Sequence, residues 1–210
     1  MILAPLILAI DTTGDVGSIA LVRDGLIIEE RILDSPDGFA HVLFIEIEQM
    51  MERHGIALDA IDLFAAASGP GSFTGVRVGL TAVKGLAEAT GRKVIAVSNL
   101  QALAVFGTGD LRATVIDARR GEIYGAVYNS ALELVCDEVV MKLDAWLDGL
   151  PREVEFISRG IGVEGGVEVS GALAGAVGRI AAARAGMAKD PAEIDANYVR
   201  RSDAELLWRD

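Results

Sequence analysis

The chain has 210 residues, of which 51% are hydrophobic, and a net charge of −12 at pH 7. A chain of this length can bury a core large enough to fold without disulfide bonds or a structural metal. The charge argues against a protein that binds nucleic acid on its own, because such proteins concentrate Lys and Arg to neutralise phosphates. If RNA is involved, we expect a partner to supply most of the positive surface.

Neither a disulfide nor a membrane segment is expected. The chain contains a single cysteine, Cys136, which we interpret as a small buried hydrophobic residue. The apolar run from Ile2 to Ile10 is about half of the roughly 20 residues that span a bilayer, and Pro5 interrupts it. This run also lacks the basic region and the cleavage site of a signal peptide. We therefore expect a cytoplasmic protein.

Apolar runs and turn residues predict alternating strands and helices in the first half. Asp24-Gly25 marks a tight hairpin, because such turns need residues that accept positive φ. Gly91 is a typical residue just past the end of a helix. The expected strands are Leu6–Asp11, Gly17–Arg23, Leu26–Leu33, Leu63–Ala67 and Val94–Val97, and the expected helices are Phe39–His54, Ser72–Thr90 and Leu100–Phe106.

The same order of elements begins again in the second half. Each half opens with an apolar strand that ends in Ile-Asp, at Asp11 and at Asp117. This repeat predicts a duplicated α/β fold with two lobes, residues 1–100 and a smaller 101–210, each with a mixed β-sheet and flanking helices. The strands expected here are Ala113–Asp117, Glu122–Tyr128, Leu132–Val140 and Val154–Ser158, and the helices are Lys142–Leu147 and Gly171–Gly186.

The helix predicted from residue 39 carries apolar residues on two sides. Val42 and Ile45 lie outside the main apolar arc, towards Glu48 and Glu52. Either a partner covers this second surface or the whole helix lies within a larger core. The main arc covers about 140° at 100° per residue, and its members are Phe39, Leu43, Phe44, Ile47, Met50 and Met51.

A loop between the first two strands, Asp11-Thr12-Thr13-Gly14, places a carboxylate and two hydroxyls together. Actin-like ATPases and sugar kinases bring a loop of this kind to nucleotide phosphates and magnesium. Thr13 replaces the usual glycine, which leaves less room for backbone to approach phosphate. The loop is therefore either a weak phosphate-binding candidate or a hairpin whose Asp11, Thr12 and Thr13 satisfy turn amides.

The most informative stretch, Gly69-Pro70-Gly71-Ser72-Phe73-Thr74-Gly75, joins a buried strand to a helix. Ser72 is a good N-cap, and the amides that follow it would point outward at the positive end of the helix dipole. The turn is therefore either purely structural or an anion cradle. It is neither a Walker A motif nor a nucleophile elbow. The anion-binding candidates are Gly69, Gly71, Ser72, Phe73 and Thr74.

Gly75 and Gly79 share one face of the predicted helix with Ala82. Two interior glycines cost about 1 kcal/mol each relative to alanine. We therefore expect another helix or a stretch of backbone to approach this face closely. The approaching group belongs either to the same chain or to a partner.

The sequence predicts no metal site and no catalytic residues. His41 and His54 point about 140° away from each other on one helix, and Ile45 stands where a His-x-x-x-His metal site needs its second ligand. A triad of Ser72, His41 and an aspartate has nothing in the sequence to orient it.

Four charged residues crowd the segment Asp117-Ala118-Arg119-Arg120-Gly121-Glu122-Ile123-Tyr124. One interpretation is an ordinary solvated turn. The other is a surface that presents Arg119 and Arg120 to a partner or a phosphate. The sequence leaves both open.

Together these segments resemble the TsaB family of bacterial tRNA threonylcarbamoyladenosine biosynthesis proteins. The resemblance runs in order from about residue 6 to 201, and residues 69–79 are its most specific part. The region from about 130 to 190 matches loosely. The segments that carry the resemblance are Ile7–Thr13, Gly69–Arg77 with Gly79 and Ala82–Ala87, Val97–Leu100, Asp117–Tyr124 and Tyr198–Arg200.

The resemblance implies an actin-like (ASKHA, ribonuclease H-like) duplicated fold. It also implies a non-catalytic role beside TsaD, a related protein that transfers a threonylcarbamoyl group to an adenine next to the tRNA anticodon. The implied partners are a TsaD-like protein in a heterodimer, a TsaE-like ATPase, tRNA only through the complex, and a second copy when the chain is alone. No cofactor is implied, because Thr13 and the short second lobe make ATP binding doubtful.

In the family, the two helices of the first lobe form the contact with TsaD. TsaD keeps a histidine pair for its metal, whereas this chain has His41 and Ile45 at the comparable helix. The interface residues that the resemblance implies here are Val42, Ile45, Gly75, Val76, Gly79, Ala82 and Val83.

We therefore expect a scaffold that activates a tRNA-modifying transferase. The alternative is an actin-like small-molecule kinase or ATPase that places Asp11, Thr12 and Asp117 around phosphates. A metallopeptidase of the M22 glycoprotease type is less favoured, because the sequence gives no support for peptide hydrolysis.

Overall fold

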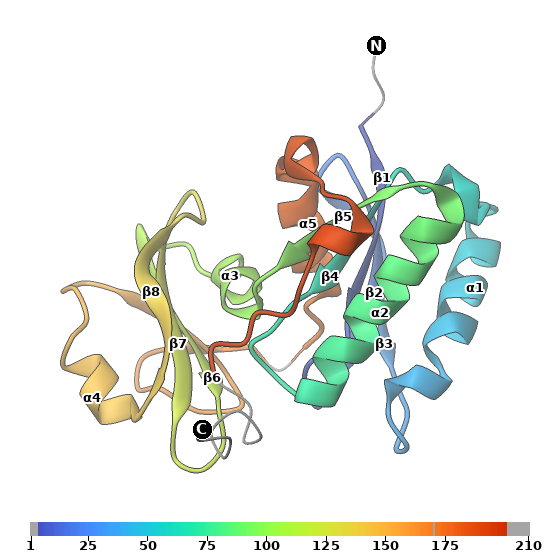
Figure 1. Ribbon diagram of the computed structural model, residues 1–210. Helices are drawn as coiled ribbons and strands as arrows, with labels where there is room; N and C mark the ends of the chain where they lie inside the picture. The colour runs from blue at the N-terminus through green and yellow to red at the C-terminus, as the bar shows by residue number, and fades with distance from the viewer. Residues whose placement is uncertain (1–3, 170, 201–210) are drawn as a thin grey trace, which may run out of the picture. The chain divides into compact units, whose positions relative to one another are not determined.

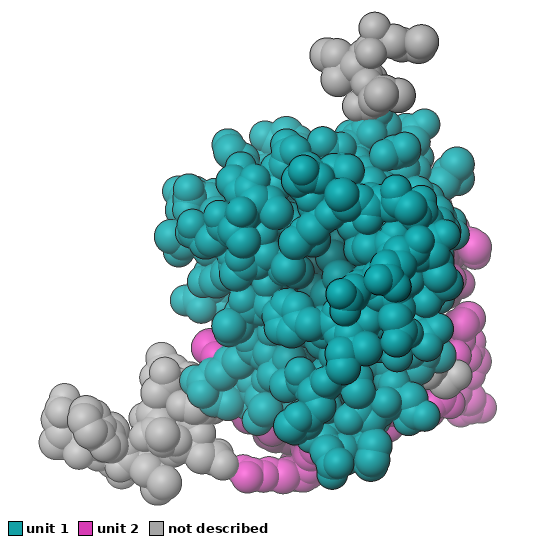
Figure 2. Space-filling view, turned by 90° about the vertical axis from the view of Figure 1, so that its right-hand side faces the viewer, with its two compact units in different colours: residues 1–102, 171–196 teal, residues 103–170, 197–210 magenta. Residues whose placement is uncertain are grey.

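The computed structural model describes residues 4–169 and 171–200. The chain divides into two compact units, coloured separately in Figure 2. Unit 1 comprises residues 1–102 and 171–196, and unit 2 comprises residues 103–170 and 197–210. Each unit is built on one five-stranded sheet (Figure 1).

The sheet of unit 1 has the strand order β3-β2-β1-β4-β5. β1 (Leu6–Asp11), β2 (Gly17–Arg23) and β3 (Leu26–Leu33) form an antiparallel meander. β4 (Leu63–Ala67) pairs in parallel with β1, and β5 (Lys93–Val97) pairs in parallel with β4. Three antiparallel strands followed by two parallel ones, in this order, define a ribonuclease H-like sheet.

Helices cover both faces of this sheet (Figure 1). α1 (Leu43–Arg53) and α2 (Phe73–Thr90) lie on one face, where their buried residues share a core with alternate residues of β1 and β2. α5 (Ala174–Ala183) packs on the other face, against β1, β2 and β4. Because both faces are covered, β1 is apolar along its length instead of alternating with polar residues.

α5 lies in unit 1, although the sequence placed residues 101–210 together in a second lobe. Two glycines let the backbone of this helix approach the sheet. A Cβ at Gly175 would lie 2.5 Å from Cδ1 of Ile27, and a Cβ at Gly178 would lie 2.5 Å from Cγ2 of Val22. The predicted lobe boundary is therefore corrected, because the chain returns to unit 1 after Gly171.

Unit 2 repeats the topology of unit 1. β6 (Leu111–Asp117), β7 (Ile123–Asn129) and β8 (Leu134–Met141) form an antiparallel meander, and β9 (Glu155–Arg159) and β10 (Val167–Glu168) extend it in parallel from β6. The strand order is β10-β9-β6-β7-β8. Read from the β8 edge, this is the order of unit 1, which confirms the predicted duplicated, actin-like fold.

α4 (Leu143–Leu147) covers one face of the unit 2 sheet through its buried Trp146. The indole occupies the space above Gly125, where a Cβ would lie 2.6 Å from Cε2 of Trp146. Glycine in the interior of β7 is explained by this close approach. The remaining described elements are α3 (Asn99–Ala104), η1 (Phe39–His41), η2 (Leu58–Ala60), η3 (Ala185–Met187) and η4 (Pro191–Glu193).

None of the helices formed by residues 4–169 and 171–200 is both long and apolar enough to cross a bilayer. The helix expected from residue 39 begins as the 3₁₀ turn η1 and becomes α-helical at Leu43. Within α1 the buried members of the apolar arc are Leu43, Ile47, Met50 and Met51. Phe44 belongs to the apolar arc of the sequence but is 54% exposed.

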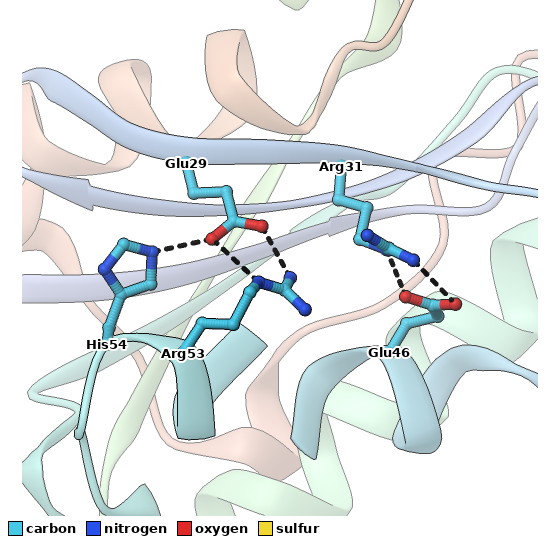
Figure 3. A network of polar contacts seen from close by, with 5 residues as sticks. All are labelled: Glu29, Arg31, Glu46, Arg53 and His54. Carbon is cyan, nitrogen blue, oxygen red and sulfur yellow. Dashed lines mark hydrogen bonds and ion pairs between the residues drawn. The ribbon is translucent and has the colours of Figure 1, made fainter. Parts of the chain in front are cut away.

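A network of ion pairs joins the edge strand β3 to α1 (Figure 3). Arg53 Nη2 lies 2.5 Å from Glu29 Oε1, and His54 Nε2 lies 2.6 Å from Glu29 Oε2. Arg31 and Glu46 form a second pair between the same two elements. The hydrogen bond from Arg53 holds the pKa of Glu29 below its ordinary value of 4.5, with His54 contributing, although partial burial opposes the shift.

We predict that Glu29→Gln destabilises the protein at pH 7 by less than about 1 kcal/mol, because exposed ion pairs contribute little. The folded pKa of Glu29 lies below its unfolded value, so its stabilising effect is present above pH 4.5 and is lost as the pH falls through the folded pKa. Urea unfolding of both proteins between about pH 7 and pH 3 measures this dependence. A difference that stays constant across this range would contradict the assigned pair.

Candidate functional site

The loop between β1 and β2 is the first candidate site, and its polar groups serve the hairpin itself. Asp11, Thr12 and Thr13 have exposed fractions of only 0%, 1% and 2%. Thr13 donates to Asp11 Oδ1 twice, from its backbone N at 2.9 Å and from Oγ1 at 2.6 Å. Asp11 therefore closes its own turn, as in the structural interpretation of this segment.

This hairpin interlocks with the turn that precedes α2. Ser72 N donates to Thr13 O at 2.7 Å, and Thr12 Oγ1 donates to Gly75 O at 2.6 Å. A Cβ at Gly75 would lie 2.0 Å from Thr12 O, and one at Gly71 would lie 2.5 Å from Thr13 O. Glycine is required at both positions, because any side chain would overlap the hairpin backbone.

Gly79 continues this contact one turn further along α2. It is buried, and a Cβ there would lie 2.8 Å from Thr12 Oγ1. The glycine stripe therefore accommodates the chain's own hairpin, which is the first of the two alternatives that the sequence left open. A contact of Gly75 and Gly79 with a partner stays a prediction. Val76, Ala82 and Val83, also placed in the predicted interface, lie in the core of unit 1.

The two predicted interface residues on α1 and its N-terminal flank have different surroundings. Val42 is half-buried and packs against the core of unit 1. Ile45 is 53% exposed, and its neighbour Phe44 is 54% exposed. The exposed apolar surface on α1 therefore centres on Phe44 and Ile45.

Asn99 completes the interlock, although the sequence assigned it no role. Its Nδ2 donates to Thr13 Oγ1, and its Oδ1 accepts from Gly69 N at 3.1 Å. Asn99 N also donates to Gly69 O at 2.8 Å. One side chain thus joins the hairpin, the turn before α2 and the start of α3. The sequence signal that could have identified Asn99 is its position as a polar residue shortly after the end of the buried strand β5.

The turn before α2 uses much of its hydrogen-bonding capacity within the chain. Ser72 caps the helix as predicted, since its Oγ accepts from Gly75 N at 3.2 Å. Gly69 and Gly71 contact Asn99 and the hairpin as described above. Anion binding therefore stays a prediction for Phe73 and Thr74. The Arg77 guanidinium lies 3.7 Å above the Phe73 ring.

The described residues provide no metal site that could support hydrolysis. Within residues 4–169 and 171–200, no group of three or more His, Cys, Asp and Glu side chains is placed to hold a metal ion. His54 pairs with Glu29, and His41 is exposed. Ser72 Oγ is engaged as the cap of α2 and has the role of a structural acceptor.

The hairpin between β6 and β7 is the corresponding loop of unit 2, and it has an unusual backbone. Arg119, Arg120 and Gly121 have φ values of 62°, 57° and 75°. A left-handed conformation costs a non-glycine residue about 1–2 kcal/mol. Asp117 Oδ1 accepts from Arg119 N at 2.8 Å and stabilises the turn. Asp117 is thus used much as Asp11 is used in unit 1.

We predict that Gly75→Ala destabilises the protein by about 1–3 kcal/mol, because the new Cβ would overlap Thr12 O. Gly85→Ala is the matched control in the same helix, since nothing lies within 4 Å of its Cβ position. That control should gain up to about 1 kcal/mol from helix propensity. Urea denaturation checks both variants, and equal effects would contradict the interlock.

Comparison with known proteins finds relatives that are named for tRNA modification. Residues 38–205 match the family model of TsaD, the tRNA N6-adenosine threonylcarbamoyltransferase. The tRNA threonylcarbamoyladenosine biosynthesis protein TsaB of Bacillus subtilis is 34% identical over 152 residues, which cover 70% of this chain and 66% of the relative. TsaB of Escherichia coli is 36% identical over 126 residues, 58% of this chain and 54% of the relative. The chain thus spans about half to two thirds of the length of these relatives.

Two solved structures from Pseudomonas aeruginosa share the fold over most of the chain. A protein described as similar to peptidase YEAZ superposes with a TM-score of 0.79 at 28% identity and covers 93% of this chain and 100% of its own. YeaZ superposes with a TM-score of 0.76 at 27% identity and covers 92% of this chain and 99% of its own. The family model covers more than half of the chain, and the fold agrees with it. The chain therefore belongs to the TsaB/YeaZ family, which is related to TsaD.

Proposed function

We propose that the chain is a non-catalytic subunit that binds and activates a TsaD-like transferase in the threonylcarbamoyladenosine modification of tRNA. Its relatives from Bacillus subtilis, Escherichia coli and Haemophilus influenzae carry the name tRNA threonylcarbamoyladenosine biosynthesis protein TsaB. The matching family model is that of the transferase. These similarities support a role in the same tRNA modification. The exposed apolar surface of unit 1 supports the role of a partner subunit.

Exposed apolar side chains on the outer face of α1 carry this proposal. Phe44 and Ile45 are 54% and 53% exposed, although the opposite face of the helix already fills the core. Phe73, at the start of α2, is 41% exposed. Large apolar residues on helices whose inner faces are already packed are typical of a surface that docks another helix.

The outer faces of α1 and α2 carry opposite charges around this apolar centre. Glu48 and Glu52 are exposed on α1 beside Arg53, which pairs with Glu29, whereas Arg77 and Lys84 lie on α2 together with the exposed Glu88. The balance is therefore negative on α1 and positive on α2. Two lobes of the same fold related by a two-fold axis could therefore place α1 of one against α2 of the other with matching charges. This supports a heterodimer with a TsaD-like protein and a homodimer when the chain is alone.

The interlock of the first hairpin supports a non-catalytic role. Thr12 O and Thr13 O face the first turns of α2, and Gly71 and Gly75 have no space for an inserted group. Phosphate binding by such a loop uses backbone amides, and the Thr13 amide already donates to Asp11 Oδ1 within the hairpin. We therefore propose that the chain needs no nucleotide, and that the TsaE-like ATPase and the tRNA join through the complex.

We predict that the double substitution Phe44→Asp and Ile45→Asp leaves the chain folded but reduces co-purification with the TsaD-like protein at least about tenfold. Both side chains are exposed, so their loss should leave the core intact. Leu134→Asp with Val135→Asp is the matched control, because these residues of β8 are 49% and 48% exposed. Normal co-purification of the α1 variant would argue against this surface, as would an equal loss in the control.

We also predict that the isolated chain neither binds nor hydrolyses ATP in the presence of magnesium, because the hairpin is closed by its own hydrogen bonds. Isothermal titration calorimetry and a phosphate-release assay measure both properties. Micromolar binding accompanied by turnover would instead favour an actin-like kinase or ATPase.

A further inference from the structure

We propose that unit 2 contributes a contact to the phosphate backbone of the tRNA through an arginine hairpin, which we define as residues 117–122 together with Arg159 and Arg200. This inference rests on the proposed function, which supplies the RNA. It goes beyond that function by giving this acidic chain its own part in binding the RNA. The contact belongs to the complex, since a net charge of −12 opposes RNA binding by the chain alone.

The backbone of the hairpin fixes the Cα–Cβ directions of two adjacent arginines, and the Arg119 guanidinium lies 3.7 Å from Asp117 Oδ2. Arg119 and Arg120 are both exposed and both left-handed, with φ of 62° and 57°. Three hydrogen bonds hold the turn: Arg119 N donates to Asp117 Oδ1 at 2.8 Å, Glu122 N donates to Arg119 O at 3.1 Å, and Ala118 N donates to Glu122 O at 3.0 Å. A rigid turn reduces the conformational entropy lost when its side chains bind a ligand.

Arginine is an unexpected residue at these two positions. Left-handed backbone favours glycine or asparagine, and the chain places glycine at the next position, Gly121. Strained residues of this kind are concentrated at functional sites, where the role of the side chain outweighs the energetic cost of the backbone conformation. The geometry therefore points to a role for the two guanidinium groups themselves.

Arg200 supports the hairpin from within unit 2. Its Nη1 donates to Ala118 O at 2.8 Å, and its guanidinium pairs with Glu122. The guanidinium also lies 5.6 Å from the centre of the Tyr124 ring. Arg200 thereby offsets the charge of Glu122 and leaves the hairpin more positive.

Arg159 lies at the same edge of the unit 2 sheet. It ends β9 and is paired in register with Ile116 of β6. A Cβ at Gly160 would lie 3.6 Å from Cβ of Asp117, which places the end of β9 beside the hairpin. The backbone thus brings Arg159 to the edge that carries Arg119, Arg120 and Arg200, where the two carboxylates of the hairpin pair with Arg119 and with Arg200. Four arginines and two carboxylates leave this edge with a positive balance.

The chemistry of these side chains favours RNA phosphates as the ligand. Guanidinium groups bind phosphate oxygens in a bidentate manner. A pair of neighbouring arginines alone would bind weakly, but it adds affinity once a partner holds the RNA, because the second contact becomes intramolecular. An acidic protein segment could bind to the same arginines, and measuring tRNA binding distinguishes this ligand from RNA.

The test uses Arg119→Gly with Arg120→Gly in the purified complex with the TsaD-like protein. Glycine accepts both φ values, so the fold should be kept. Fluorescence anisotropy with a labelled, unmodified tRNA transcript measures affinity at several salt concentrations. We expect the affinity to fall about tenfold or more and the slope of log Kd against log salt to decrease by about 2.

Two further variants serve as controls. Lys142→Ala with Arg152→Ala removes the same charge from exposed positions elsewhere in unit 2 and should change the affinity less than about threefold. Arg119→Lys with Arg120→Lys keeps the charge but loses the bidentate geometry, so it should restore the salt slope and only part of the affinity. An equal loss of tRNA affinity in the Lys142 and Arg152 control would overturn the proposal, because the loss would then depend only on the net charge of the chain.

The outcomes also separate this inference from the proposed function. If the wild-type chain forms no complex with the TsaD-like protein, the proposed function fails and the RNA contact fails with it. If the complex forms but the glycine variant binds tRNA with wild-type affinity and salt slope, the RNA contact alone is overturned. If the complex with the glycine variant no longer binds the TsaE-like ATPase but binds tRNA as the wild type does, the RNA contact is likewise overturned. That result would indicate an acidic protein segment as the ligand.

Discussion

The contact between the Thr12 carbonyl and the first turn of α2 is the constraint on which unit 1 depends. Because Gly75 has no Cβ, the helix backbone comes close enough for Thr12 Oγ1 to donate to Gly75 O at 2.6 Å. The same approach lets Ser72 N donate to Thr13 O, and Asn99 then closes the group. A loop that an actin-like ATPase would open to phosphate is used here to fix the position of a helix.

Fixing α2 also determines what unit 1 presents to other molecules. The inner faces of α1 and α2 fill the core, so Phe44, Ile45 and Phe73 remain at the surface. Unit 2 keeps the same topology but ends its first hairpin in two exposed arginines. The two surfaces proposed to bind partners are therefore built on loops and helices whose backbones are held by internal hydrogen bonds.

Much of the fold could be predicted because its signals are local in the sequence. Asp24-Gly25 forms the expected turn with φ of 53° and 69°, and Gly91 ends α2 at φ 64°. The partners of the glycines could not be predicted, because the spacing of Gly75 and Gly79 indicates close approach without saying what approaches. The small residues of α5 likewise indicate tight packing but do not identify the sheet. Those answers depend on contacts between residues more than 60 positions apart, such as Thr12 with Gly75.

Hydroxyl-radical footprinting of the chain, free and monomeric by dilution or in complex with the TsaD-like protein, tests the docking role most directly. Oxidation reports the exposure of individual side chains, and Phe44, Phe73 and Met187 are 54%, 41% and 69% exposed in the chain alone. The docking role predicts that the complex protects Phe44 and Phe73 and leaves the oxidation of Met187 unchanged. Unchanged oxidation of Phe44 and Phe73 in a complex that has formed would contradict it.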